Sequence, residues 1–217
     1  MDVLLTMLER RSARAFTDEV VGRDTLTKIL HTASQAPSAI NMQPWEIHVA
    51  TGEERKRLSR RLWKSYRERQ VTCGPGSKAP IPEKFVQRAR ECAEQMTPLI
   101  EESGSEFKRF INEGSLDFYG APAVVLIFLD DSFAADAMID VGTFTAYLVL
   151  AAAAEGLGTC PIGLVKAYGD EIKDHLNIAE SKVLALSVAI GKTDPGAPIN
   201  RFRSARVPVA DFVRWID

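Results

Sequence analysis

The chain has 217 residues, with 27 Lys and Arg against 29 Asp and Glu, which gives a formal net charge of −2. This length is sufficient for one sizeable hydrophobic core, so we expect a single domain over residues 1–217. The balanced charge excludes a general cationic field that would hold nucleic acid or anionic lipid, and any site for an anion must therefore be local.

The cysteines and the apolar segments favour a cytoplasmic protein. Three cysteines without a C-x-x-C pair argue against a disulfide framework or a structural zinc site and fit a reducing compartment. The three histidines are widely spaced, so we expect no metal. Residues 1–19 lack the apolar core of a signal peptide. The uncharged stretch 141–154 is shorter than the roughly 18 residues of a membrane span, so it predicts a buried helix and no membrane contact.

The first third of the chain predicts two helices and a strand. A short amphipathic helix over 3–11 ends in the cationic run Arg10-Arg11-Ser12-Ala13-Arg14. A second helix over 24–35 has apolar residues at helical spacing and ends where Pro37 follows. A loop between Pro37 and Pro44 comes next. Residues 45–50 alternate apolar and polar side chains, which predicts a half-buried strand.

The middle of the chain, residues 53–116, predicts a variable helical insertion or lid. It comprises a charged helix over 53–71, a loop over 73–82 and one or two helices over 83–111, broken around Pro98 and Gly104. The apolar run 123–129 predicts a central strand, followed by a long helix over 134–155 and a strand over 182–190. The tail, 194–217, carries aromatic residues that need apolar surface, so we expect it to wrap around a partner subunit.

Two N-terminal segments suggest a phosphorylated aromatic cofactor. The run from Arg10 to Arg14 places three guanidinium groups and a hydroxyl within five residues, which suits a phosphate or another compact anion. The loop from Pro37 to Pro44 can present backbone and amide groups to a polar heterocycle. Arginines recur at 201, 203 and 206. A solvated face or a basic arm for nucleic acid would use the same residues, but the acidic balance elsewhere counts against the latter.

The segment 156–163 admits several interpretations. Gly156 and Gly158 follow a helix, so they are better explained as a helix cap than as a dinucleotide-binding motif, which follows a strand. Residues 159–163 read as a tight loop, either an ordinary turn or a place where Gly163 lets a backbone N–H approach a flat ligand. A nucleophilic pair of Cys160 with a histidine has no accompanying hydrolase signature.

The order and spacing of five motifs resemble the FMN-dependent nitroreductase family. They are residues 10–16 (RRSARAF), the block 36–45 (APSAINMQPW), 118–122 (FYGAP), 156–163 (GLGTCPIG) and 206–208 (RVP). The resemblance implies an α+β fold with a nitroreductase-like central mixed or antiparallel sheet flanked by helices. It also implies a domain-intertwined homodimer with FMN at the subunit interface. NADPH or NADH would be the electron donor.

The resemblance also assigns site residues. The FMN phosphate and ribityl chain would be held by Arg10, Arg11, Ser12, Arg203 and Arg206. Arg14 would lie near the pyrimidine edge of the flavin. The same flavin would be reached from the other subunit by Pro37, Ser38, Ala39, Asn41 and Gln43. The isoalloxazine would be covered by Pro161 and Ile162, with the backbone N–H of Gly163 or Leu164 pointing at N5. Some members of that family have a lysine where this chain has Ser204, so the resemblance implies that phosphate affinity would rely more on Arg203.

The implied reaction is a ping-pong two-electron reduction of a small aromatic substrate, a nitroarene or a quinone. A fixed guanidinium near N1 and O2 would stabilise the anion of reduced FMN. Because the flavin carries the hydride at N5, no catalytic protein residue is required. Alternatives are another reaction of the same fold (ene reductase, dehydrogenase or reductive dehalogenase) or a flavin-binding protein without turnover.

Overall fold

The computed structural model describes residues 2–74 and 79–216, so part of the loop predicted at 73–82 lies outside the described residues. Its helices are α1 (Val3–Glu9), α2 (Arg23–Ala33), α3 (Gly52–Arg69), α4 (Glu83–Glu102), α5 (Phe107–Leu116), α6 (Ala137–Ala154) and α7 (Gly169–Leu176). Its strands are β1 (Glu46–Thr51), β2 (Ala123–Asp130), β3 (Gly158–Ile162) and β4 (Lys182–Gly191). Short 3-10 turns are η1 (Ala39–Asn41), η2 (Phe118–Gly120), η3 (Leu164–Tyr168), η4 (Pro198–Arg201) and η5 (Val209–Asp211).

The four strands form one sheet in the order β1-β2-β4-β3, and every neighbouring pair is antiparallel. The apolar run in β2 is buried over Ala123–Leu129 because it has a strand on each side and helices over both faces. Val125 pairs with Val49 of β1 and Val188 of β4. The expectation of an α+β fold with a central antiparallel sheet is therefore confirmed.

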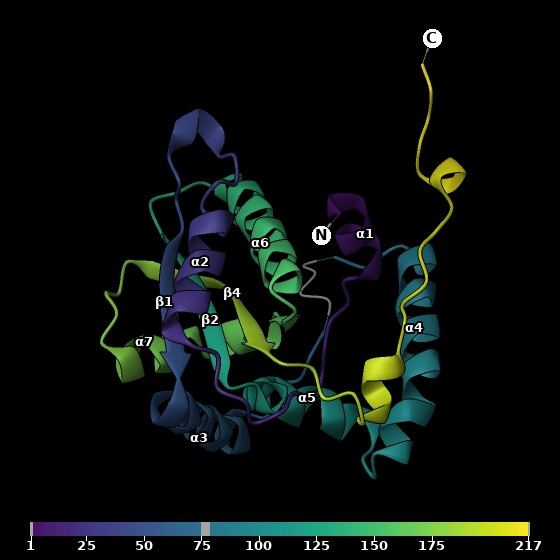
Figure 1. The fold of residues 1–217 in the computed structure, drawn as a ribbon, viewed down its shortest axis with the longest axis horizontal. Coiled ribbons are helices and arrows are strands. Elements are labelled where there is room, and N and C mark those ends of the chain that lie inside the picture. The colour runs from purple at the N-terminus through teal and green to yellow at the C-terminus, as the bar shows by residue number, and fades with distance from the viewer. Residues whose placement is uncertain (1, 75–78, 217) are drawn as a thin grey trace.

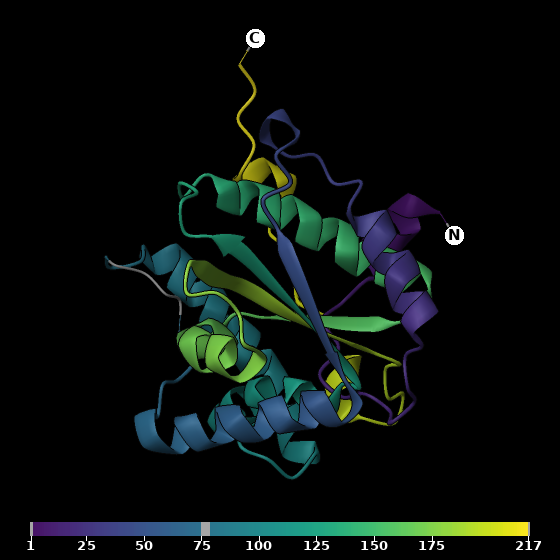
Figure 2. The ribbon, with the colours of Figure 1, turned by 90° about the vertical axis from the view of Figure 1, so that its left-hand side faces the viewer.

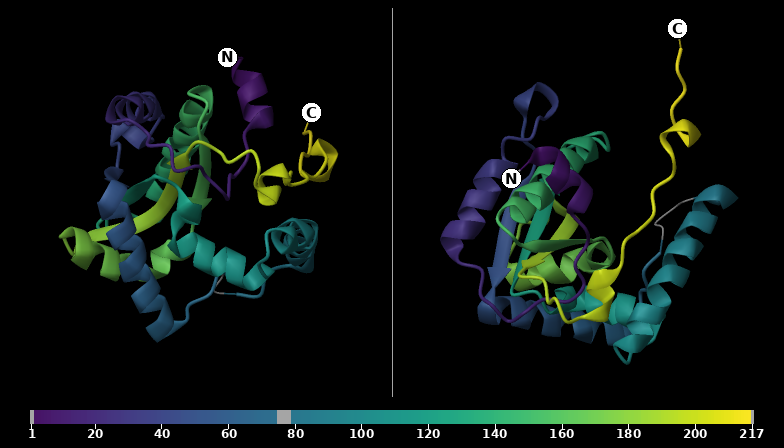
Figure 3. Two further views of the ribbon diagram at one scale, coloured as in Figure 1. Left: turned by 60° about the horizontal axis from the view of Figure 1, so that its bottom comes forward. Right: turned by 45° about the vertical axis from the view of Figure 1, so that its right-hand side comes forward.

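Helices cover both faces of the sheet (Figure 2). One face packs against α2 and α6, whose apolar stripes share a core cluster with β2 and β4. The other face packs against α3, α7 and the turns η2 and η3. Helix α4 lies outside these layers, where it contacts α5 and η4 (Figure 1). Beyond η4 the tail continues away from the sheet (Figure 3).

The predicted core helix is present as α6, but only half of its residues are buried. Among the described residues it is the one helix whose length and composition would suffice to cross a bilayer. Its position against α2 and the sheet accounts for the apolar sequence of the buried face. The opposite face exposes Ile139 and Tyr147, and this side of the helix is therefore available to a partner.

Two local expectations were wrong. Helix α4 continues through Pro98, because Pro98 lies on an exposed face while Met96 and Ile100 are anchored in a cluster with Ile199. The break occurs only at Gly104, in the left-handed region with φ +76°. The segment expected as a loop at 159–163 is mostly the strand β3, which pairs with β4 from Gly158 to Ile162. Pro161 is tolerated there because β3 is an edge strand.

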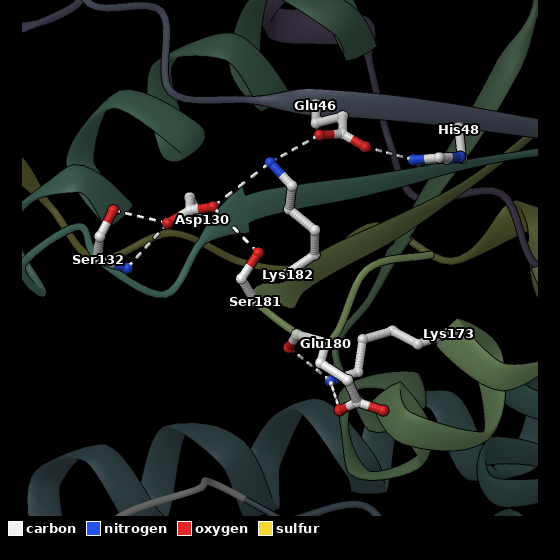
Figure 4. A network of polar contacts seen from close by, with 8 residues as sticks. All are labelled: Glu46, His48, Asp130, Ser132, Lys173, Glu180, Ser181 and Lys182. Atoms are coloured by element: carbon white, nitrogen blue, oxygen red, sulfur yellow. Dashed lines mark hydrogen bonds and ion pairs between the residues drawn. The ribbon is translucent and has the colours of Figure 1, made fainter. Parts of the chain in front are cut away.

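A charged network joins the ends of β1, β2 and β4 (Figure 4). Lys182 Nζ lies 2.8 Å from Glu46 Oε2 and 3.5 Å from Asp130 Oδ2. His48 Nε2 lies 2.8 Å from the other Glu46 oxygen, and the Ser132 hydroxyl donates to Asp130 at 2.6 Å. The hydrogen bonds from Lys182 and then His48 lower the pKa of Glu46, and the bond to Glu46 raises the pKa of Lys182. Ion pairs of Lys182 thus link the end of β4 to the ends of β1 and β2.

Candidate cofactor and substrate site

The N-terminal cationic segment lies along the edge of the sheet. Ser12 forms a parallel bridge with Thr159 of β3, and Ala13 N donates to the Thr159 carbonyl at 2.9 Å. Phe16 bridges to Thr193, just beyond β4. The segment that follows α1 is therefore held in an extended conformation next to β3, which fixes the direction in which its side chains leave the backbone.

The side chain of Asn200 ties this segment to the C-terminal tail. Its Oδ1 accepts from Arg14 N at 2.9 Å, while its Nδ2 donates to the carbonyls of Ala15 at 2.8 Å and Asp194 at 2.9 Å. Asn200 is buried. Because all three partners are backbone groups, one amide sets how the two distant segments meet.

The two cationic segments meet in one cavity of about 460 Å³, here called the arginine cavity. Its walls come from the C-terminal part of α1, the segment that follows it, Cys92 of α4 and the tail. Its polar lining consists of the acidic Glu9 together with Arg10, Arg11, Ser12, Arg14, Arg203, Ser204 and Arg206. None of these five arginines forms an ion pair within the described part of the chain. Burial, followed by the charge of Arg203, lowers the pKa of Arg11. An anion in this cavity would relieve that repulsion.

Backbone oxygens and a hydroxyl hold the two tail arginines. Arg203 donates to the carbonyl of Asn200 at 3.1 Å and that of Phe202 at 3.0 Å. Arg206 donates to the Ser204 hydroxyl at 2.6 Å. Ser204 thus contributes an acceptor that orients Arg206.

A second, mostly apolar cavity of about 690 Å³, here called the acceptor cavity, adjoins the first. Its apolar walls come from α4, α5 and the end of β3, with Phe85, Phe107, Ile111 and Ile162 among them. Arg14 lines both cavities and therefore stands at their junction. The positions from Pro161 to Leu164 all line this cavity. A Cβ added to Gly163 would meet no atom within 4 Å, so the backbone there faces open space.

Two titratable side chains that line the acceptor cavity, Cys160 and Tyr119, have pKa values raised by burial. Burial raises the pKa of Cys160 to about 11, against the opposing charges of Arg14 and Arg10. Burial likewise raises the pKa of Tyr119 to about 12, with Cys160 adding to the shift. Both groups are neutral at pH 7, so Arg14 is the charged group that faces both cavities.

The loop predicted to contact a flavin lies elsewhere in the same chain. None of Pro37, Ser38, Ala39, Asn41 and Gln43 lines either cavity, and the loop projects from the end of the molecule beyond α2 (Figure 1). Ala39 N is held by Asp140 Oδ1 of α6 at 3.2 Å. Ile40, Asn41 and Gln43 have left-handed φ of 43°, 60° and 48°. Backbone strain of this kind persists only where surrounding contacts hold the loop in one conformation.

Sequence reasoning missed three residues of the site. Asn200, Ser115 and Tyr119 were given no role, although Tyr119 lies inside the motif 118–122. No periodicity singles out Asn200 or Ser115. The signal at Tyr119 was its neighbour Gly120, which marks a left-handed turn at φ +76°.

The fold and the joined cavities define a protein that can bind a phosphorylated cofactor and place a flat ring beside an apolar chamber. The chain belongs to the nitroreductase family, whose model matches residues 7–192. It is 29% identical over 209 residues to nitroreductase NfnB of Mycolicibacterium smegmatis, covering 95% of this chain and 89% of that protein. It is 29% identical over 213 residues to a 4-nitrobenzoate reductase of Pseudomonas putida, covering 95% and 92%.

A solved structure resembles the whole chain. The FMN-dependent nitroreductase NfnB from Mycobacterium smegmatis, in complex with NADPH, superimposes with a TM-score of 0.89 at 27% identity, covering 100% of both chains. The expectation of membership in this family is therefore confirmed.

Proposed function

We propose that this chain is an FMN-dependent NAD(P)H oxidoreductase that reduces nitroaromatic or quinone acceptors by a ping-pong mechanism. The observation that carries the proposal is the junction at Arg14, where a cavity of unpaired arginines meets a larger apolar cavity. A phosphate suits the first cavity and a small aromatic acceptor the second. The names of the relatives, a nitroreductase and a 4-nitrobenzoate reductase, support the same class of reaction.

The residues present fit FMN. Ser12, Arg203 and Arg206 offer donors for a phosphate, and Arg10 and Arg11 add charge around them. Arg14 places a cation between the phosphate region and the apolar region. The open space over Gly163 leaves room for a ring against the backbone. When bound, FMN would supply the hydride chemistry, for which the chain itself needs no nucleophile.

The acceptor cavity would select flat, apolar substrates and limit access of water. Phe85, Phe107 and Ile111 are among its large apolar side chains, whereas Ala89 and Ala93 are small. Burial keeps the Cys160 thiol neutral at pH 7, because its pKa is raised to about 11. The chain's contribution to turnover is therefore to hold the two reactants together and to keep a cation at their edge.

We also propose that the enzyme is a homodimer in the cytoplasm, built from one domain with a helical insertion at 53–116. The apolar side chains of α1, including Leu8 at 84% exposed, and those of the tail, including Trp215 at 82%, need a partner surface. The loop at 37–43 would reach the arginine cavity of a second copy, since it lies away from the cavities of its own chain. Cys73, Cys92 and Cys160 are all free thiols, which suits the cytoplasm.

The direct test is spectroscopic and kinetic. Purified protein should be yellow, should retain FMN through gel filtration, and should oxidise NADPH or NADH when a nitrobenzene derivative is added. Arg14→Met should retain the phosphate ligands but lose most turnover. A colourless protein that takes up no added FMN would contradict the proposal.

A further inference from the structure

The mouth of the acceptor cavity carries two cations to which the proposed function gives no role. Phe85 of α4 lines this cavity and is 45% exposed, so its ring lies where the cavity opens to solvent. Lys84 Nζ lies 5.0 Å from the centroid of that ring, and Arg88 Cζ lies 5.4 Å from it. Both distances are within the range of cation–π contacts. Lys84, Phe85 and Arg88 are here called the cationic rim.

The chain itself neutralises neither cation. Within the described residues, Lys84 and Arg88 form no ion pair, and the neighbouring Glu83 instead interacts with Arg90 at 3.7 Å. Lys84 and Arg88 are also four residues apart on one helix, a spacing at which like charges repel and destabilise the helix. An anion at the cationic rim would relieve this repulsion.

The lining of the acceptor cavity favours a negatively charged guest as well. Among the described residues it includes no Asp or Glu, and its charged member is Arg14. Since the formal net charge of the chain is −2, this positive bias is local. The apolar walls, with Phe107 and Ile111, suit a flat ring. An aromatic molecule with an anionic substituent therefore matches the cavity and its mouth better than a neutral one.

We propose that the cationic rim makes this enzyme selective for nitroarenes that carry a carboxylate, with Lys84 and Arg88 as specificity-determining residues. The apolar walls select the ring, and the rim adds selection for the charge on its edge. Arg88 offers paired N–H donors that match a carboxylate, whereas Lys84 supplies a point charge. The inference rests on the proposed function, since it takes a nitroarene as the acceptor in this cavity.

The kinetic test compares 4-nitrobenzoate with 4-nitrobenzamide, a neutral acceptor of nearly the same shape, in FMN-loaded holoenzyme. Wild type should have the higher kcat/KM for the carboxylate, and this preference should fall as ionic strength rises, because the rim is exposed. The double variant Lys84→Met with Arg88→Met should lose about fivefold of the preference, as expected for two exposed charged contacts. The loss should appear in the KM for 4-nitrobenzoate, with kcat near the wild-type value.

A binding measurement without turnover uses benzoate and benzamide, which carry no nitro group to accept electrons. Titration of oxidised holoenzyme, followed by the change in FMN absorbance, gives the Kd of each compound. The Kd for benzoate should rise about fivefold in the double variant, while the Kd for benzamide should stay near its wild-type value.

Arg90→Met is the matched control for Arg88→Met. Arg90 belongs to the same helix, but it interacts with Glu83 at 3.7 Å and donates to Gln87 at 2.8 Å, and it lines neither cavity. Its replacement changes the net charge as much as Arg88→Met does. The preference for the carboxylate should nevertheless remain at the wild-type value in Arg90→Met and fall in Arg88→Met.

The outcomes separate this selectivity from the proposed function. Equal kcat/KM for both acceptors in wild type, or an undiminished preference in the double variant, would overturn the selectivity and leave the proposed function intact. The phosphate that distinguishes NADPH from NADH is a second anion of suitable charge. If the double variant changed only the KM for NADPH relative to NADH, the rim would serve the donor and the proposal would be wrong. Wild-type protein that binds no FMN would instead contradict the proposed function.

Discussion

At the scale of single residues, Asn200 shows how much of the site depends on one uncharged side chain. Its three hydrogen bonds all reach backbone groups, two of them in the segment of Arg14 and Ala15 and one at Asp194. The arginines around the cavity could be recognised from the sequence by their charge and spacing. The amide that brings them together could not, because a single asparagine in an irregular tail has no pattern around it.

Replacing Asn200 by alanine should lower the affinity of the arginine cavity for FMN while the protein remains folded. The change leaves the Arg14 N–H and two carbonyls without their partner, at a cost of about 1–3 kcal/mol. We expect the Kd for FMN, measured by fluorescence quenching, to rise at least about tenfold. Asn177→Ala is the control, because Asn177 caps α7 with a left-handed φ of 54° away from the cavities. Equal FMN affinity in both variants would contradict the role of Asn200.

Arg206→Ala and Ser12→Ala should each weaken retention of FMN, by about 1–3 kcal/mol, the range for a lost charged or polar partner. The matched control is Arg201→Ala, since Arg201 lies in the same tail but pairs with Glu102 and does not line the arginine cavity. Isothermal titration of apoprotein with FMN separates the three variants. An unchanged dissociation constant in both test variants would mean that the phosphate lies elsewhere.

At the scale of elements, the sequence predicted most helices and strands because their patterns are long. Seven elements agree with the structure to within three residues at each end, from α1 to β4. The errors lie where a distant contact decides the local conformation. Helix α4 passes through Pro98 because Ile100 is anchored against Ile199, and β3 forms because β4 offers it an edge. The local sequence of α4 does not show that Ile199 will pack against it, and that of β3 does not show that β4 will lie beside it.

The charged network at the strand ends predicts a dependence of stability on pH at both extremes. Glu46 and Asp130 have lowered pKa values, the latter through its bonds to Ser132, so their stabilisation is present at neutral pH and lost as pH falls through those lowered values. Lys182 has a raised pKa, so its contribution is lost as pH rises above its ordinary 10.5. Lys182→Met should lower the melting temperature at pH 7 and flatten both limbs of the profile.

The control for this profile is Lys166→Met, an exposed lysine of η3 that has no ion pair within the described residues. Differential scanning calorimetry across pH 3–11 compares the variants. If Lys182→Met melts with the wild-type profile, the network contributes nothing to stability, as is common for exposed pairs.

At the scale of the whole molecule, the apolar surface is larger than a lone chain needs. Helix α1 buries only Thr6, whereas Leu4 and Leu8 are exposed, and the tail exposes Phe212 and Trp215. Seven residues of helix with that pattern are not stable in water without a surface to cover them. The sequence predicted that the cationic segments converge, and the structure brings them together in one cavity. How a second copy completes the site remains a prediction.

Disrupting the exposed face should therefore separate subunits and release cofactor together. We expect wild-type protein to sediment as a dimer and Leu4→Glu or Trp215→Glu, neither of which lines the arginine cavity, to shift it toward monomer, with loss of bound FMN. Val20→Glu, at a residue that is 80% exposed in the segment before α2, is the control. Monomeric wild-type protein that retains FMN would refute the intersubunit site.

Apart from Cys92, the residues that line the arginine cavity lie within 7–14 and 202–206, two segments far apart in the chain. Synthesis must therefore pass position 206 before the proposed flavin site can form. During translation the cationic N-terminal segment has neither Asn200 to hold it nor β3 to lie against until those parts emerge. Loading of the proposed cofactor would thus follow synthesis of Asn200, because a nascent chain arrested before that position lacks the amide that holds the segment of Arg14 and Ala15.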